Sequence, residues 1–556
     1  MTDLNVASCN ASKIVHSVLK TIGGFAIELK QLPGETFCQL VREEANLAST
    51  LQTAYKVSRA TNVSLQSDGT SRDGKKSVGF QANTSKQQTF TLGVPQVPTG
   101  ESSEQLDAFK FVINKMATLT SAPENTHQKS KELVAKFKNT MADGAASQKM
   151  FNRLVQAYRE EVLPDVIENW SEMDEATKQQ MTSMNHLYCN LHALIGFATY
   201  ADEALNKLEC VWRKVKGSPL GVETLKEFQD KDGTYSWAHS DSATQRLIRT
   251  ACESVCPGGN QQAGRIKDFE LFLNVKYGLQ RDTRMHVFRA NRFNVLFECA
   301  ASVYYHSSHL QTMFREGSVK AGNKLLRAVM ADVNSKPLLA GCRALGIIYV
   351  NITEPYWRLV DRQDVHILDL TKSLQEVMSL FQKWSTDATP LLQSDLPPIF
   401  STPTGPLTPV KDKLYTALFE ETSDEMTQLT KQALEVTKAN ISLVIHRRFK
   451  DQAAFDTSDP TLRAETADMN KSNMRGENDF GYWAYLQSAK PTMGEMAAEG
   501  QLMFKLNNTA AWLEALATED PAQYKAVMLQ ARRDRAKWHR KYEDRKKDCE
   551  RGKRQR

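Results

Sequence analysis

The sequence contains no apolar run long enough to cross a membrane and no secretory signal. A bilayer span needs about 20 predominantly apolar residues, and no segment approaches that length. The first residues, MTDLNVASCNASK, lack the basic flank and apolar run that a signal peptide requires. These absences predict a protein of the cell interior that has no membrane partner.

Cysteine is also sparse and unpatterned. Nine cysteines are scattered through 556 residues, and the only close pair is Cys252 and Cys256. A disulfide framework is typical of short secreted chains, so we expect reduced thiols. The spacing CxxC…HxxxH does not occur, which excludes zinc fingers of that type.

Positive charge is concentrated near the C-terminus. Residues 532–556 contain 13 Lys or Arg and 5 Asp or Glu, a net charge of +8, whereas the whole chain carries +6. A basic segment on a near-neutral body is typical of a nucleic-acid contact, a nuclear address or both. A solvated, partly helical tail explains the same pattern. The candidate DNA-contacting side chains are Arg532, Arg533, Arg535, Lys537, Arg540, Lys541, Lys546 and Lys547.

The first third of the chain predicts an α/β core after a helical segment at 1–56. Three successive strands are indicated by segments rich in β-branched and aromatic residues, NVSLQ, SVGFQANTS and TFTLGVPQV, with breaks at DGTSRDGKK and SKQQ. A helix over about 104–118, a short strand ending at TMAD and an amphipathic helix that includes Phe151 follow. This order fits an RNase-H-like core, although composition does not separate it from other α/β layouts.

From about residue 165 onward the sequence predicts an almost wholly helical chain. Two segments interrupt it: a loop at CPGGNQQAG (256–264) and a Pro-rich exposed linker at SDLPPIFSTPTGPLTPV (394–410). A last helical unit is predicted over about 480–547. With a chain of this length we expect two or three structural units.

Three acidic residues occur in settings suited to metal chemistry on phosphodiesters, Asp68 in SLQSDGTS, Asp143 in KNTMADGAAS and Glu477 in MRGENDFGYW. Asp68 and Asp143 each follow a predicted strand, where a carboxylate is rigidly held and can face a cleft. Each acid also has a structural explanation. Asp68 fits an Asp-Gly turn, Asp143 fits a helix cap, and Glu477 fits an ordinary surface position.

Five segments, taken in chain order, resemble those of hAT-like DDE transposases over roughly residues 60–515. SDGTS and MADGAAS resemble the segments that carry the first two catalytic acids. YCNLHALIGFA, with Cys189 and His192, resembles the family's C-x-x-H segment. RFNVLFECAASVYYHSSHL, from Arg292, resembles the R-W element, with Phe293 where Trp is usual. ENDFGYW…GQLMFKLNNT resembles the element that holds the third acid beside a dimerisation region.

The resemblance implies a transposon-derived DDE-type DNA transposase or nuclease. Its fold would be an α/β RNase-H-like core interrupted by a large all-α insertion. Asp68, Asp143 and Glu477 would be catalytic and would bind two Mg²⁺ or Mn²⁺ ions. Arg292 and Phe293 would contact DNA, Phe293 by stacking on a base, with core packing as its alternative. For Cys189 and His192 we expect a packed structural pair.

The same resemblance sets the expected organisation. We expect an N-terminal helical segment at 1–56, the first part of the core at 57–204 and a helical insertion with the Pro-rich linker at 205–465. The end of the core with dimerisation-type helices is expected at 466–530 and a basic tail at 531–556. The expected partners are DNA and further copies of the chain, and the expected location is the nucleus.

Two departures from the family pattern favour a second interpretation. The sequence begins without the family's zinc-binding recognition module, and GENDFG lacks the Ser before and the Arg after the family's third acid. Both suit a catalytically silent, domesticated transposase that acts as a DNA- or protein-binding scaffold. A third interpretation, an unrelated helical scaffold, predicts that Asp68 and Glu477 lie far apart in the fold.

Overall fold

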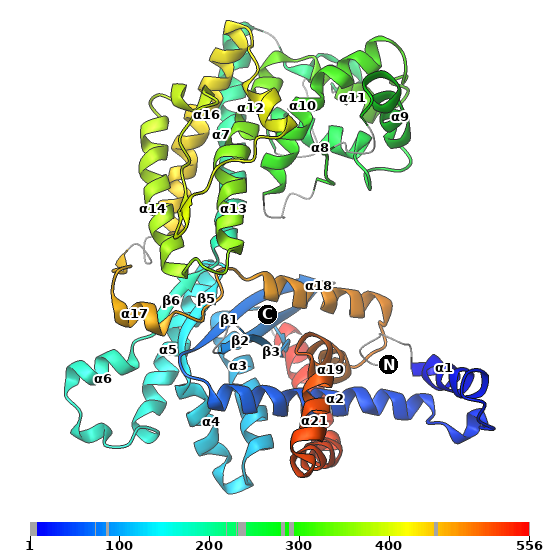
Figure 1. Ribbon diagram of the computed structural model, residues 1–556, viewed down its shortest axis with the longest axis vertical. Helices are drawn as coiled ribbons and strands as arrows, with labels where there is room; N and C mark the ends of the chain where they lie inside the picture. The colour runs from blue at the N-terminus through cyan, green and yellow to red at the C-terminus, as the bar shows by residue number, and fades with distance from the viewer. Residues whose placement is uncertain are drawn as a thin grey trace. The chain divides into compact units, whose positions relative to one another are not determined.

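The computed structural model describes residues 8–72, 74–84, 88–217, 219–229, 231, 241–279, 284–288, 294–449 and 454–554. Within these ranges the chain is mostly helical, as predicted, with a small mixed sheet (Figure 1). It forms two compact units, one from residues 1–189 together with 458–556 and the other from residues 190–457. The expected insertion, 205–465, covers most of the second unit, but that unit begins and ends earlier in the chain.

The first unit is built around a sheet with the spatial strand order β3-β2-β1-β5-β6, with β4 paired to β2. The pairs that join β1, β2 and β3 are antiparallel, whereas β1–β5 and β5–β6 are parallel. A parallel pair needs a crossover connection, and helices supply both of them here. The strands are β1 Val63–Arg72, β2 Lys75–Thr84, β3 Gln88–Gly93, β4 Gln96–Val97, β5 Phe137–Ala142 and β6 Asn185–Tyr188.

Three strands, β1, β2 and β6, correct the sequence-based expectation. β1 and β2 continue through most of the segment predicted as a break, so Asp68 lies inside β1, paired with Gly79, and not in a turn. The antiparallel ladder sustains these strands past the point where their apolar pattern ends. β6 shows that the chain is not wholly helical after residue 165, because its four residues, NHLY, carry too little pattern to reveal a strand.

One face of the sheet packs against α3 (Ser102–Thr120) and α5 (Ala146–Val162). The predicted helix over 104–118 is the middle of α3, and its buried residues recur at helical spacing. Between α3 and β5 the chain adds α4 (Thr126–Ala135), which the sequence pattern does not reveal. The centre of this layer is an aromatic cluster with ring centroids 5.6 to 6.4 Å apart, formed by Phe80, Phe109, Phe137 and Phe151.

The opposite face of the sheet is covered by α18 (Met474–Ala489), as Figure 1 shows. A Cβ on Gly79 would lie 3.2 Å from the Phe480 ring, so the glycine lets α18 approach β2 closely. The buried Asp479 carboxylate accepts hydrogen bonds from Gln81 Nε2 and Thr91 Oγ1, each at 2.8 Å. These bonds fix α18 to β2 and β3. The neighbouring helices of this unit are α1 Ser8–Thr21, α2 Glu35–Arg59, α6 Glu175–Thr182, α17 Pro460–Glu465, α19 Glu495–Leu506 and α20 Thr509–Glu519.

The predicted basic tail is part of a long helix, α21 (Pro521–Arg554), that packs on the first unit. Its apolar side chains at helical spacing, including Trp538 and Tyr542, are buried. A fully buried ion pair, Lys115 Nζ to Glu499 Oε1 at 3.0 Å, lies beside it, and Lys115 Nζ also donates to Tyr542 at 2.8 Å. The helix is therefore a structural part of this unit and not a separate tail.

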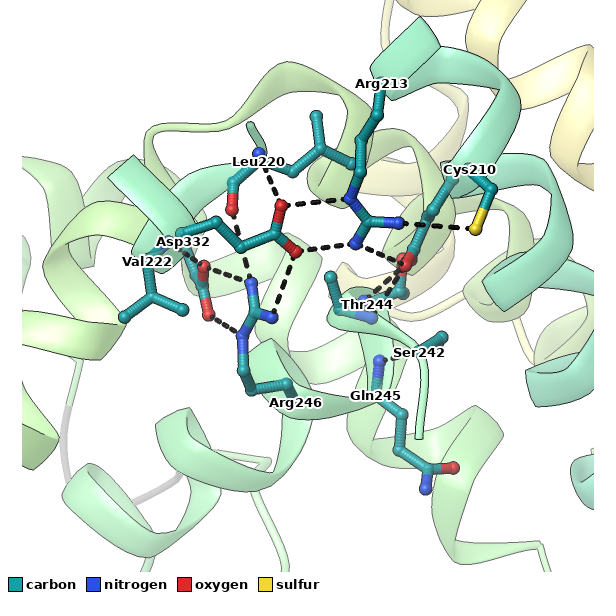
Figure 2. A network of polar contacts seen from close by, with 12 residues as sticks. Cys210, Arg213, Leu220, Val222, Ser242, Thr244, Gln245, Arg246 and Asp332 are labelled. Atoms are coloured by element: carbon teal, nitrogen blue, oxygen red, sulfur yellow. Dashed lines mark hydrogen bonds and ion pairs between the residues drawn. The ribbon is translucent and has the colours of Figure 1, made fainter. Parts of the chain in front are cut away.

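In its described residues the second unit has helices, irregular segments and one pair of two-residue strands. A buried ionic network joins α8 (Ala243–Val255) and α11 (Lys324–Val333) to the segment around Val222 (Figure 2). Asp332 accepts two hydrogen bonds from the Arg246 guanidinium, at 2.9 and 2.8 Å, and one from the Val222 N–H at 2.7 Å. The helices are α7 Asn190–Lys216, α8 Ala243–Val255, α9 Ile266–Tyr277, α10 Val295–Arg315, α11 Lys324–Val333, α12 Lys336–Ile348, α13 Glu354–Asp361, α14 Ile367–Trp384, α15 Lys413–Phe419 and α16 Asp424–Phe449.

The Pro-rich segment 394–410 lies within the second unit and does not connect the two units. Most of its residues are exposed, as predicted, but Phe400 is buried with its ring centroid 5.6 Å from that of Tyr356. The short pair β7 (Ser401–Thr402) and β8 (Gly405–Pro406) follows directly. The buried phenylalanine anchors this segment to its own unit.

Candidate functional site

The parallel pairing of β1 with β5 brings Asp68 and Asp143 to one edge of the sheet. The register pairs Gln66 with Met141 after a shift between Val63 and Ser64. Asp68 lies two residues beyond Gln66 within β1, and Asp143 lies two residues beyond Met141, directly after β5 ends, so both acids are at the same end of this strand pair. Side chains two positions apart in a strand share a face, so Asp68 follows the face of Gln66, where Asn473 at the start of α18 contacts it.

Asp68 is almost completely buried, with 8% of its surface exposed. Its Oδ1 accepts a hydrogen bond from the Gly69 N–H at 2.7 Å, and its Oδ2 accepts one from Asn473 Nδ2 at 2.8 Å. Burial raises the pKa of Asp68 to about 8, and the negative charges of Asp143 and Glu477 add to the rise. The three acids are therefore close enough to interact electrostatically.

Asp143 directly follows β5 and is partly exposed. Its Oδ1 accepts a hydrogen bond from the Ala145 N–H at 2.8 Å, which closes a turn before α5. Gly144 between them has φ of +80°, a conformation that favours glycine. Asp143 therefore does not cap α5 as its alternative interpretation predicted, because the N-cap of that helix is Ala145. The Asp143 carboxylate lies on the rim of the same pocket that Asp68 lines.

Glu477 reaches this region from the far end of the chain. It lies in the first turn of α18, where its N–H donates to the Asn473 carbonyl at 3.2 Å. Because Asp479, two residues later, fixes α18 to the sheet, the position of Glu477 is set by the core packing of its own helix. The prediction of the third interpretation, that Asp68 and Glu477 lie far apart, does not agree with their electrostatic coupling.

Asn473 is the residue that joins α18 to the site, and the sequence gives little sign of it. Its side-chain amide donates to Asp68, and its backbone N–H donates to Cys189 Sγ at 3.1 Å. A Cβ on Gly476 would lie 2.8 Å from Asn473 Oδ1, so the glycine provides the space that the asparagine occupies. The sequence offers only the segment NMRGE, in which an asparagine and a glycine precede the predicted acid.

Asp68 and Asp143 open onto a pocket of about 250 Å³. The residues lining it come from β1, β2, the loop before α3 and the start of α5, and include Asp68, Gly69, Thr70, Lys76, Asp143, Ser147 and Gln148. Its oxygen donors are those that Mg²⁺ and Mn²⁺ prefer. Beside Asp68 on the same strand face, the fully buried Gln66 amide has no hydrogen-bond partner for either of its polar atoms.

The carboxylate oxygens of the pocket and the unpaired amide of Gln66 are of the chemical type that binds a hydrated divalent cation. The acidic side chains, however, lie farther apart than direct coordination of one ion requires. In the part of the chain that the structure describes, no three His, Cys, Asp or Glu side chains are grouped closely enough to hold a metal. The acids are thus electrostatically coupled without forming a closed ligand set.

The predicted DNA-contacting residues fall into two groups. Arg292 and Phe293 lie outside the described residues. The basic residues of α21 are on its surface, and several have acidic neighbours there. Ion pairs at 3.2 to 3.8 Å join Arg535 to Glu43, Lys547 to Asp544 and Arg532 to Glu44. Lys537, Arg540 and Lys546 are exposed, Arg533 pairs with Asp534, and Lys541 Nζ lies 4.1 Å from the Trp538 ring centroid.

The spacing of Cys189 and His192 would set them one turn apart on a helix, but only His192 lies in a helix. Cys189 directly follows β6 and precedes α7, and its N–H donates to the Ala142 carbonyl at 2.8 Å. His192 belongs to the first turn of α7, in the second unit. Among the described residues, Cys189, Cys252 and Cys256 are not joined in disulfide bonds.

Comparison of the sequence with models of protein families and with curated proteins finds no match. None of the helices in the described ranges combines the length and the apolar character needed to cross a bilayer.

Proposed function

We propose that this protein is a hAT-like, DDE-type enzyme that cuts or transfers DNA strands at phosphodiester bonds. The observation that carries the proposal is the coupling of three carboxylates from distant parts of the sequence, Asp68, Asp143 and Glu477. Two of them come from adjacent parallel strands and the third from a helix laid across those strands. An RNase-H-like core is supported by the mixed sheet, in which three antiparallel strands precede two parallel ones.

The three acids would hold Mg²⁺ or Mn²⁺. When bound, such ions supply charge that activates an attacking oxygen and stabilises a leaving one. The chain's own contribution is to prepare the carboxylates. Asp68, with a pKa near 8, keeps its proton until positive charge arrives, and Asn473 holds one of its oxygens in place. Proton loss from Asp68 is therefore coupled to occupation of the site.

Asp68 is buried, whereas Asp143 lies on the pocket rim and is partly exposed, so Asp143 can turn toward a phosphodiester in the pocket. Glu477 is partly exposed in the first turn of α18, one turn beyond Asn473, whose side chain contacts Asp68. Lys76 and Gln148 line the same pocket and can contact phosphate oxygens. DNA as substrate, a homo-oligomeric state and a nuclear location belong to this proposal.

A second function, a catalytically silent scaffold that binds DNA or protein, is favoured by one observation. The described side chains do not form a closed ligand set, and Asp68 is held neutral at ordinary pH. In that case Asp68 would stabilise the fold in its protonated form, and the exposed cations of α21 would carry the binding.

A nicking assay separates the two functions. Purified protein is incubated with supercoiled plasmid and with labelled duplex in Mg²⁺, Mn²⁺ or EDTA, alongside Asp68→Asn, Asp143→Asn and Glu477→Gln. Asp107→Asn, an exposed acid on α3, is the matched control. Metal-dependent cleavage that each site variant abolishes and Asp107→Asn retains supports the enzyme. DNA binding without cleavage, unchanged in all four variants, supports the scaffold.

A further inference from the structure

A second, larger pocket lies on the first unit, and the proposed reaction does not use it. Its volume is about 460 Å³. Its wall is formed by the β1–β2 hairpin, Gln96 of β4, the continuous stretch from the end of α18 to the start of α19, and α21. Its charged lining residues are Arg72, Lys75, Lys490, Glu495 and Lys546.

The wall of this pocket is strongly cationic. Arg72, Lys75, Lys490 and Lys546 contribute four positive charges, and Glu495 is the one acid among the lining residues. The Glu495 Oε1 already accepts the Gln96 N–H at 3.1 Å, so this carboxylate is engaged with the backbone. Arg72, Lys75 and Lys546 are exposed and Lys490 is half-buried, so the pocket has an excess of positive charge that favours a bound anion.

Backbone donors add to this field. The twelve-residue helix α19 begins at the pocket, with Gly494 as its N-cap and no side chain capping its first N–H groups. The N-terminus of a helix carries partial positive charge and free amides, which favour an anion. Burial, together with Arg42, lowers the pKa of Lys490 to about 8, and a bound anion would oppose that effect.

The position of the pocket relates it to the acid site. Ser77 of β2 lines both pockets, and the neighbouring hairpin residues alternate between them, with Lys76 in the acid pocket and Lys75 in the cationic one. The hairpin therefore forms a common wall. A polyanionic strand that places one phosphate at Asp68 has a cationic pocket directly beside it for a flanking phosphate.

We propose that this cationic pocket binds a backbone phosphate of the nucleic-acid strand whose cleavable bond lies at the acid site. The inference rests on the proposed function, because it takes the acid pocket as the place where a strand is cut. Phosphate as a free ion or mononucleotide has the same chemistry. A strand is favoured because the acid pocket next to it fits a phosphodiester and because the wall continues along the hairpin.

The test replaces three pocket lysines together, Lys75→Gln, Lys490→Gln and Lys546→Gln, in the full-length protein. The control is Lys525→Gln, an exposed lysine on the same helix as Lys546 but outside the pocket. Binding of a fluorescent single strand and of a duplex is measured by anisotropy over a range of salt concentrations. Thermal melting of each variant without ligand establishes that it is folded.

The triple variant is expected to bind roughly 10- to 100-fold more weakly, with a salt slope reduced by about 2 to 3, because each neutralised phosphate contributes about 0.7 to 0.9 to that slope. Affinity and slope equal to those of Lys525→Gln would overturn the inference. No binding of either strand by the wild type, together with binding of inorganic phosphate or a mononucleotide that the triple variant loses, would also overturn it and assign the pocket to a small anion.

Failure of the inference and failure of the proposed function give different results. Cleavage by the wild type, with normal strand binding by the triple variant, rejects the pocket and keeps the enzyme. Strand binding that depends on the three lysines, without metal-dependent cleavage, keeps the pocket and rejects the enzyme. Asp107→Asn, an exposed acid of α3 that lines neither pocket, should retain strand binding in either case.

Discussion

Asn473 of α18 donates its side-chain amide to Asp68 of β1 at 2.8 Å, a bond between residues 405 positions apart in the chain. Partners of this kind orient a metal-binding carboxylate, and their removal typically costs 10- to 100-fold in metal affinity. We therefore expect Asn473→Ala to bind Mn²⁺ roughly 10- to 100-fold more weakly, measured by isothermal titration. Asn470→Ala, which loses only a bond to Thr89 Oγ1, is the control. Equal affinities in the two variants would contradict the prediction.

Two glycines of α18 should respond in opposite ways to the same change. Gly476→Ala places a Cβ 2.8 Å from Asn473 Oδ1, so it should lower the free energy of unfolding by about 1–3 kcal/mol. Gly481 has nothing within 4 Å of an added Cβ, so Gly481→Ala should raise it by about 0.5–1 kcal/mol. Urea denaturation measures both. A stabilising Gly476→Ala would show that Asn473 moves freely.

The raised pKa of Asp68 predicts a specific pH dependence of stability. Between its ordinary value of 3.8 and the folded value of about 8, the folded protein holds a proton that the unfolded chain has lost. The free energy of unfolding should therefore fall as pH rises through this window, by up to about 1.4 kcal/mol per pH unit. Asp68→Asn removes this slope, so its stability relative to wild type should increase from pH 5 to pH 8 without divalent cations.

The measurement is urea denaturation in EDTA at several pH values across that window. Asp107→Asn, an exposed acid of α3, should run parallel to wild type. A difference between Asp68→Asn and wild type that stays constant with pH would show that Asp68 ionises normally in the folded protein.

The buried Lys115–Glu499 pair predicts strong coupling in the first unit. Lys115→Met leaves the Glu499 carboxylate buried without its cation, so it should cost about 3–5 kcal/mol. Adding Glu499→Leu should recover part of that loss, because an apolar pair leaves no uncompensated charge. Denaturation of both single variants and the double variant gives the coupling energy, and additive losses would argue against the pair.

The parts of the fold that the sequence predicts are those with a long or repeated local pattern. β1, β2 and β3 are each marked by β-branched and aromatic residues, and the apolar stripe of α3 identifies that helix. Four-residue β6 lacks enough residues to show a period. The sequence does not reveal that α21 is partly buried, because Lys and Arg separate its apolar residues and such a pattern predicts a solvated tail.

The candidate site shows the same division. Asp68 and Asp143 can be identified locally because each precedes a glycine and follows the predicted end of a strand. The link between them depends on a register shift at Val63 and Ser64, which is a property of strand pairing and not of either segment. Asn473 was beyond prediction because its role exists only after α18 has packed across the sheet.

The second unit, residues 190–457, divides the sequence of the first, and this order has a consequence during synthesis. Asp68 and Asp143 leave the ribosome before that unit, and Glu477 leaves after it. At roughly 5–20 residues per second, the intervening stretch takes on the order of tens of seconds to translate. Through that interval the nascent sheet lacks α18, and its two aspartates face water without the third acid. A newly made chain therefore has no complete acid site until the second unit and the first turn of α18 have been translated.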